Sequence, residues 1–120
     1  MVNENMQVVA SEGSREGRRV LTLKGPLTLQ TLFQFQNAVR AETAPVVIVD
    51  FTDVPFVDSA GLGALLGIMA SCQRRGRGFG VTGVIDRVRT LFRVARVDGL
   101  IPTFNSVEIA QRQLSKAASA

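Results

Sequence analysis

The chain has 120 residues, of which 46% are hydrophobic and 20% are charged, so it can form one domain with a real core and is not composed like a disordered protein. It has no histidine and a single cysteine, which excludes Ser-His-Asp and Cys-His catalysis, an internal disulfide and a zinc finger. The net charge of +4 comes mostly from arginine, but no tryptophan or tyrosine is interleaved with the basic residues to stack on bases, so we expect no direct contact with nucleic acid.

Apolar segments are too short for a membrane helix, which needs roughly 18 residues, and the polar N-terminus lacks the apolar core of a signal peptide. We therefore expect a cytoplasmic protein without membrane insertion. Residues 1–120 are expected to form a single domain, with an ordered core from about residue 6 to residue 115. The one cysteine, Cys72, falls on the apolar side of a helical pattern and is interpreted as a small core residue.

The first predicted elements are two strands, 6–10 and 19–25, on either side of a polar turn, which suggests an antiparallel hairpin. A helical pattern follows, with Thr28 as its expected N-cap. Its apolar stripe consists of Leu29, Leu32, Phe33, Phe35 and Val39. The continuous β-branched run at 45–51 then predicts a strand that is covered on both faces.

The second predicted helix begins at Asp58 or Ser59 and ends near Gly76. Glycine is a poor helix former, so its presence early in this helix needs a reason. We expect these glycines to let the helix lie close to its neighbours; they are Gly61, Gly63 and Gly67.

The remaining elements are a short strand at 79–83, an amphipathic helix within 84–97, a short edge strand at 100–104 and a closing helix that Ser106 caps. The element order β-β-α-β-α-β-α-β-α predicts an α/β fold. We expect a mixed sheet of four to five strands, antiparallel at its start and parallel across the later crossovers, with about four α-helices.

The start of the second helix is the candidate site, because sites in such sheets gather beyond the carboxyl ends of strands and at helix N-termini. From the residues alone, two interpretations remain open. In the structural one, Asp58 or Ser59 caps the helix, and Val57 pairs with Leu62 as a hydrophobic staple. In the functional one, the positive helix end favours an anion, and Ser59 accepts a phosphoryl group that adds about −1.5 to −2 charges to a docking surface.

Other chemistry fits this segment poorly. It lacks the spacing of a dinucleotide-binding G-x-G-x-x-G motif, it has no Walker A lysine, and no histidine is present to activate Ser59. A magnesium cluster of Asp50, Asp53 and Asp58 is disfavoured, because Asp50 ends a strand and Asp53 suits a turn. We therefore expect no metal, no cofactor and no catalytic residue, which disfavours a nucleotide-binding or hydrolytic protein.

The segment "VIVDFTDVPFVDSAGLGALLG" resembles the signature of the STAS domain, as found in bacterial anti-sigma factor antagonists, and the resemblance extends over most of the chain. It implies a single STAS-like domain in which Ser59 is phosphorylated by a partner that is both anti-sigma factor and serine kinase. The unmodified domain would bind that partner and free a sigma factor, and a serine phosphatase would reset the modified form. The domain would thus be a substrate and a switch, not an enzyme.

The resemblance also implies a partner-binding region, which consists of Asp58, Ser59, Ala60, Gly61, Leu62, Pro26 and Thr28. The family commonly has an acidic residue after the second strand, and "GPLT" places Thr28 there instead. This departure keeps a second interpretation open, in which the chain is a STAS-type scaffold or regulatory subunit, for example of a lipid-transport or other signalling complex, that phosphorylation does not control. We expect a monomer or a weak dimer.

Overall fold

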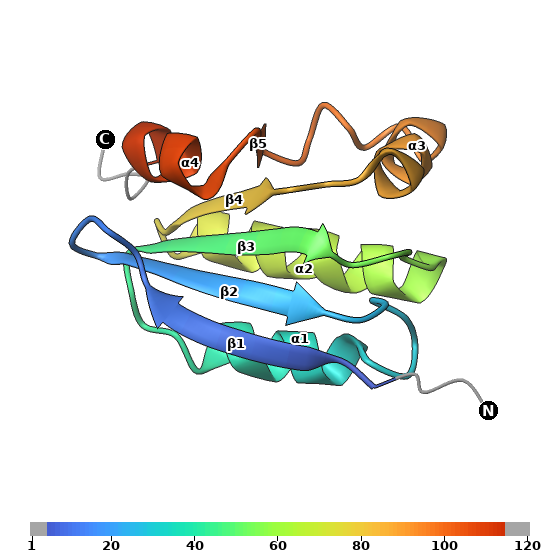
Figure 1. The fold of residues 1–120 in the computed structure, drawn as a ribbon, viewed down its shortest axis with the longest axis horizontal. Helices are drawn as coiled ribbons and strands as arrows, with labels where there is room; N and C mark the ends of the chain where they lie inside the picture. Colours follow the sequence, from blue (N-terminus) through green and yellow to red (C-terminus); the bar gives the residue numbers. More distant parts are fainter. Residues whose placement is uncertain (1–4, 115–120) are drawn as a thin grey trace.

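Five strands lie in chain order across one mixed sheet in the computed structural model, which describes residues 5–114 (Figure 1). The first two strands are antiparallel, and every later neighbour is parallel to the strand before it. This arrangement confirms the predicted antiparallel start and parallel crossovers. The strands are β1 (Gln7–Glu12), β2 (Arg18–Lys24), β3 (Val46–Asp53), β4 (Gly78–Thr82) and β5 (Thr103–Phe104).

Four helices in the described residues cover the two faces of the sheet unequally. They are α1 (Leu32–Arg40), α2 (Ser59–Arg74), α3 (Asp86–Val94) and α4 (Val107–Gln113). The apolar sides of α1, α2 and α3 contribute to one large core cluster, whereas α4 packs in a smaller cluster against the other face. Figure 1 shows α1 and α2 side by side behind the sheet. Among the described residues, no helix is long and apolar enough to cross a membrane.

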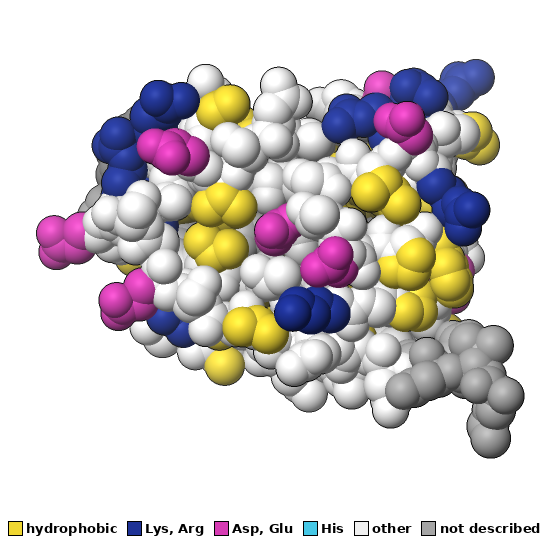
Figure 2. Space-filling model, viewed as in Figure 1, with side chains coloured by type: hydrophobic (Ala, Val, Ile, Leu, Met, Phe, Trp, Pro, Cys, Tyr) yellow, Lys and Arg dark blue, Asp and Glu magenta, His cyan; other side chains and the backbone are white. Residues whose placement is uncertain are grey.

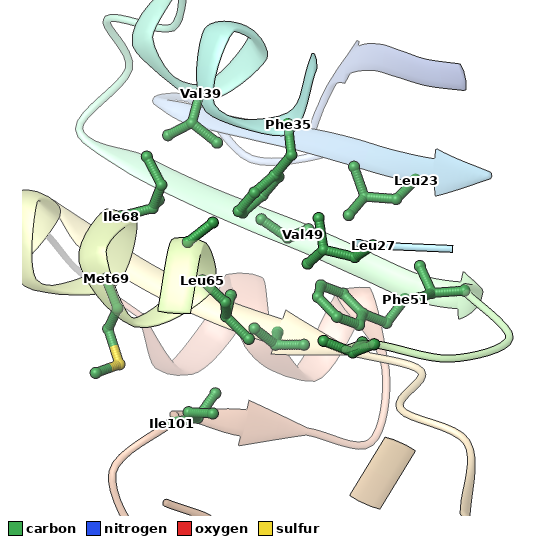
Figure 3. Packing of buried hydrophobic residues seen from close by; sticks show 14 of the residues in the cluster. Leu23, Leu27, Phe35, Val39, Val49, Phe51, Leu65, Ile68, Met69 and Ile101 are labelled. Atoms are coloured by element: carbon green, nitrogen blue, oxygen red, sulfur yellow. The ribbon is translucent and has the colours of Figure 1, made fainter. Parts of the chain in front are cut away.

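Strand β3 is buried on both faces, as its unbroken apolar run predicts. Successive side chains of a strand point to opposite faces, so Val49 faces α1 and α2 while Ile48 joins the cluster beneath α4. Figure 3 shows Phe35 of α1, Val49 of β3 and Leu65 of α2 among the buried side chains that fill the space between the helices and the sheet. Because this core fills the space between helices and sheet, it holds the start of α2 in a fixed position.

Helix α1 begins three residues later than a cap at Thr28 would place it, so that prediction was wrong. The Oγ1 of Thr31 accepts a hydrogen bond from the Thr28 amide at 2.9 Å and donates one to the Pro26 carbonyl at 2.7 Å. The Gln30 amide donates to the Thr28 hydroxyl at 3.2 Å. These hydrogen bonds close a turn over residues 28–31, and this turn replaces the first turn of the predicted helix.

The later start of α1 also changes which side chains face the core. Leu32, Phe35 and Val39 are buried, as expected, and their spacing is that of one helix face. Leu29 and Phe33 were expected in the same stripe, but they are 62% and 64% exposed. Leu29 lies in the turn before the helix and Phe33 points away from the sheet, so both apolar side chains belong to the surface.

The ends of the other elements follow their predicted signals closely. Gly76 has a φ of +70° just past α2, and the Ser106 hydroxyl caps α4 by accepting from the Ile109 amide at 3.1 Å. Cys72 is buried as expected. The last strand is shorter than predicted, because Ile101 and Leu100 form a turn on the carbonyl of Val97.

Candidate functional site at the start of helix α2

The start of α2 lies at the edge of the sheet where the parallel strands β2, β3 and β4 end. Two loops meet there. Leu27, in the loop after β2, forms a parallel bridge with Val57, in the loop after β3. The Leu27 amide donates to the Phe56 carbonyl at 3.1 Å, and the Asp58 amide donates to the Leu27 carbonyl at 3.2 Å. The two loops are thus held together by backbone hydrogen bonds that extend the pairing of β2 and β3.

Asp58 is the N-cap of α2, which decides between the two caps that the sequence left open. Its Oδ1 accepts a hydrogen bond from the Gly61 amide at 2.7 Å. Its Oδ2 accepts a second one from the Leu29 amide at 3.1 Å. One carboxylate therefore caps the helix and also anchors the loop after β2. Val57 and Leu62 are both buried in the main core cluster, in agreement with the staple positions.

Gly61 allows α2 to lie directly against the loop after β2. A Cβ atom at this position would collide with the carbonyl oxygen of Leu27. The expectation of close approach is therefore confirmed for Gly61. It was wrong for Gly63 and Gly67, where an added Cβ would meet nothing within 4 Å, because both residues lie on the exposed side of α2.

Ser59 is the first residue of α2 and is exposed. Within residues 5–114 its hydroxyl forms no hydrogen bond, and the amides of Ser59 and Ala60 have no acceptor, whereas Asp58 satisfies the amides of Gly61 and Leu62. Two free amides at a helix N-terminus, with the positive end of the helix dipole, favour an anion. The exposed start of α2 is therefore a favourable position for a negatively charged group.

The seven residues of the expected partner-binding region lie together but differ in accessibility. Ser59 is exposed, and Asp58 and Ala60 are half-buried. The other four are buried: Pro26, Thr28, Gly61 and Leu62. The buried four hold the two loops and the helix in place, so a partner could reach Ser59 and parts of its two neighbours directly.

Three exposed apolar side chains beside Ser59 were missed from the sequence. Leu29 is 62%, Phe33 64% and Phe56 40% exposed. Leu29 and Phe56 lie in the two loops that the hydrogen bonds join, and Phe33 lies in the first turn of α1, which follows the loop of Leu29. We call Leu29, Phe33, Phe56 and Ser59 the docking surface. Figure 2 shows hydrophobic side chains gathered at the right edge of the molecule, where the strands end. The break in spacing between Leu32, Phe33 and Phe35 was the signal that could have indicated an outward Phe33.

The aspartates of this region do not form a metal site. No group of three or more His, Cys, Asp or Glu side chains within residues 5–114 is placed to hold a metal ion. Asp50 instead accepts hydrogen bonds from the Thr52 amide and hydroxyl, at 2.9 and 2.6 Å, and Asp58 is used as a cap. Away from this site, burial raises the pKa of the Cys72 thiol, and the nearby Arg77 and Arg75 oppose that shift.

The sequence signature implied a mixed sheet followed by a helix that begins with a serine. The structure has this arrangement: Asp58 caps α2, and Ser59 is its first residue at the carboxyl ends of the parallel strands. The family model described as the STAS domain matches residues 7–110. That match covers most of the chain, and the chain therefore belongs to the STAS domain family.

Solved structures with the same fold include regulators and a transporter-family protein. An anti-sigma factor antagonist from Mycobacterium paratuberculosis has a TM-score of 0.79 and 19% identity, with 92% of this chain and 95% of that chain covered. The unphosphorylated anti-sigma factor antagonist SpoIIAA has a TM-score of 0.67 and 21% identity, with coverages of 89% and 94%. SpoIIAA of Bacillus is also known in a phosphorylated form.

A sulfate transporter family protein from Wolinella succinogenes has a TM-score of 0.70 and 24% identity, with 82% of this chain and 85% of that chain covered. At such identities these likenesses show the fold and not the function.

Proposed function

We propose that this chain is an anti-sigma factor antagonist, a protein-binding switch rather than an enzyme. In its unmodified form it binds an anti-sigma factor that is also a serine kinase, and so frees a sigma factor. Phosphorylation of Ser59 weakens that complex, and a serine phosphatase restores it. The observation that carries the proposal is that Ser59 is exposed at the N-terminus of α2, at the same edge of the sheet as exposed Leu29, Phe33 and Phe56.

The docking surface suits a switch because its apolar side chains favour binding of a partner, whereas a phosphoryl group on Ser59 would oppose it. The apolar side chains gain free energy when a partner removes them from water, by about 25 cal/mol for each Å² buried. A phosphoryl group on Ser59 would introduce about −1.5 to −2 charges into the same contact. Burying that charge in an apolar interface is costly, whereas in the free protein the amides at the start of α2 stabilise it.

A direct test incubates the purified chain with a cognate anti-sigma factor kinase and ATP, and measures the intact mass. We expect the mass of one added phosphoryl group, located at Ser59 by peptide sequencing. Ser59→Ala should abolish the modification, whereas Ser11→Ala, which changes an exposed serine on β1, should not. Modification of another residue with Ser59 untouched would contradict the proposal.

A second candidate function is a STAS-type scaffold or regulatory subunit that phosphorylation does not control. The residue that favours it is Thr28, which takes the place of the family's acidic residue and is 3% exposed. The likeness to a sulfate transporter family protein is in keeping with this candidate. A stable complex with a transporter ATPase, formed equally well by the wild-type chain and by Ser59→Asp, would favour it over the switch.

A further inference from the structure

A groove with a volume of about 500 Å³ lies between the C-terminal halves of α1 and α2. Figure 1 shows both helices running away from the edge that carries Ser59, so their last turns lie together at the opposite edge. The volume falls within the range of small-molecule sites, about 300–1,000 Å³. Polar and positive side chains dominate its lining; they are Arg40, Arg74, Arg75, Arg77, Gln36 and Ser71.

The positive charge of the groove is not neutralised by carboxylates. Glu42 is the one acidic residue among the lining residues, and its two oxygens accept hydrogen bonds from Arg19 at 3.0 and 3.4 Å. The Arg19–Glu42 pair is also the only ion pair within residues 5–114. The four arginines of the groove therefore carry charge that no described side chain balances.

Arg77 is held in place before any ligand arrives. Its amide donates to the Cys72 carbonyl at 2.8 Å across the left-handed turn at Gly76, which is the pairing of a Schellman motif. Its Nε donates to the Ala44 carbonyl at 2.9 Å. Its Nη2 is buried and has no acceptor within residues 5–114. A buried guanidinium nitrogen without an acceptor is costly, so the protein contacts of Arg77 leave its hydrogen-bonding capacity incomplete.

A purely structural role explains only part of this cluster. Arg40 and Arg74 lie in the last turns of α1 and α2, where a cation interacts favourably with the helix dipole. Arg77 lies beyond the end of α2 and is fixed by two hydrogen bonds with a third nitrogen left over. Interaction with the helix dipole therefore explains the positions of Arg40 and Arg74 but does not explain how Arg77 is held.

We propose that this groove binds a small anion that carries two or more phosphate groups. Guanidinium groups form paired, charge-assisted hydrogen bonds with phosphate oxygens, and several arginines around one groove suit more than one phosphate. The lining residues of α2 begin at Gly67, eight residues after Ser59, so at the helical rise per residue the groove begins about 12 Å along the helix from Ser59. The proposal therefore does not depend on phosphorylation of Ser59.

Calorimetric titration of the whole chain with pyrophosphate and tripolyphosphate, at constant ionic strength, tests the proposal. We expect saturable binding that Arg77→Gln and Arg40→Gln each weaken roughly tenfold. Arg40 is exposed, so its variant remains informative if Arg77→Gln impairs folding. Arg87→Gln, which removes the same charge from the exposed side of α3, is the matched control and should leave the affinity unchanged.

Co-sedimentation with phosphatidylcholine vesicles that contain cardiolipin separates two sources of the phosphates. Binding to soluble pyrophosphate assigns the groove to a free phosphorylated molecule. Binding to the vesicles alone, lost in Arg40→Gln, assigns it to a lipid head group. No binding to either probe, or an equal loss in Arg87→Gln, overturns the proposal, and neither result bears on the kinase assay at Ser59.

Discussion

Gly61 of α2 lies so close to the carbonyl oxygen of Leu27 that no methyl group fits between them. This contact joins the helix that carries Ser59 to the loop that carries Leu29. Gly61→Ala should therefore lower the free energy of unfolding by about 1–3 kcal/mol, the usual cost of overpacking. Urea denaturation followed by circular dichroism measures this change.

Two other glycines of the same helix provide the control for Gly61. Gly63→Ala and Gly67→Ala place the same methyl group in open space. Because alanine favours a helix over glycine by roughly 1 kcal/mol, both variants should be as stable as the wild-type chain or more stable. If all three variants lose stability equally, the contact with Leu27 is not the cause.

Asp58 has two distinct roles, and an asparagine can keep only one of them. A side-chain amide has one carbonyl oxygen in place of two carboxylate oxygens, so Asp58→Asn can cap Gly61 or hold Leu29 but not both. Asp58→Ala should lose both bonds and about 1–2 kcal/mol of stability. Asp58→Asn should lose less and show faster amide hydrogen exchange at Leu29, with α2 still protected. Unchanged exchange at Leu29 in Asp58→Asn would contradict the anchoring role.

Phe33 should contribute to partner binding and not to folding. Its side chain is 64% exposed, so Phe33→Ser should change stability by no more than about 0.5 kcal/mol. Removing an exposed aromatic anchor should weaken the complex with an anti-sigma factor by more than about 1 kcal/mol, or at least about fivefold. Val94→Ser is the matched control, because Val94 is 75% exposed on α3, outside the docking surface. Equal effects of the two substitutions in calorimetric titration would count against this surface.

A negative charge at Ser59 should have opposite effects on folding and on binding. At the first residue of α2, Ser59→Asp faces the positive helix end and should raise stability by about 0.3–1 kcal/mol. The same charge should weaken binding to the anti-sigma factor, whereas Ser59→Ala should preserve it. Thermal denaturation and titration of the same samples measure both effects. Ser11→Asp on β1 should change neither, and unaltered partner binding by Ser59→Asp would argue for the scaffold role.

Cys72 should make the fold less stable at alkaline pH. Burial raises the pKa of its thiol above the ordinary value of 9.0, so the unfolded chain loses this proton first. As the pH rises through 9.0 the native state binds more protons than the unfolded state, and stability falls by at most about 1.4 kcal/mol for each pH unit. The chain contains no tyrosine or histidine, which leaves few other groups to titrate in this range. Denaturation at a series of pH values should show a smaller decline for Cys72→Ala than for the wild-type chain.

Patterns within short stretches of sequence were sufficient to predict most of the helices and strands and their ends. The unbroken run in β3 predicted a strand buried on both faces, and the place of Cys72 on the apolar side of a helical pattern predicted that it is buried in α2. Gly76 and Ser106 marked helix ends through backbone and capping preferences that act within a few residues. The order of these elements then implied the mixed sheet, because parallel neighbours require crossovers.

The errors arose where the sequence offered two similar local choices. Both Thr28 and Thr31 can precede a helix, and the hydrogen bond from Thr31 to the Pro26 carbonyl favours the later start. Similarly, nothing in the spacing of Gly61, Gly63 and Gly67 tells which of them meets another segment. Contacts with Leu27, 34 positions earlier in the chain, make that distinction for Gly61.

The resemblance of the sequence to the STAS signature indicated the family. The sequence by itself also determined the order of the elements and the position of Ser59 at the start of a helix, because periodicity and capping are local properties. Only the tertiary structure decided that Asp58 joins α2 to the loop of Leu29, that Phe33 and Phe56 are exposed at the edge of the sheet that carries Ser59, and that four arginines meet at the far end of the same helices. These relationships connect residues from separate segments, and the packing of the helices on the sheet, not the chain order, brings those segments together.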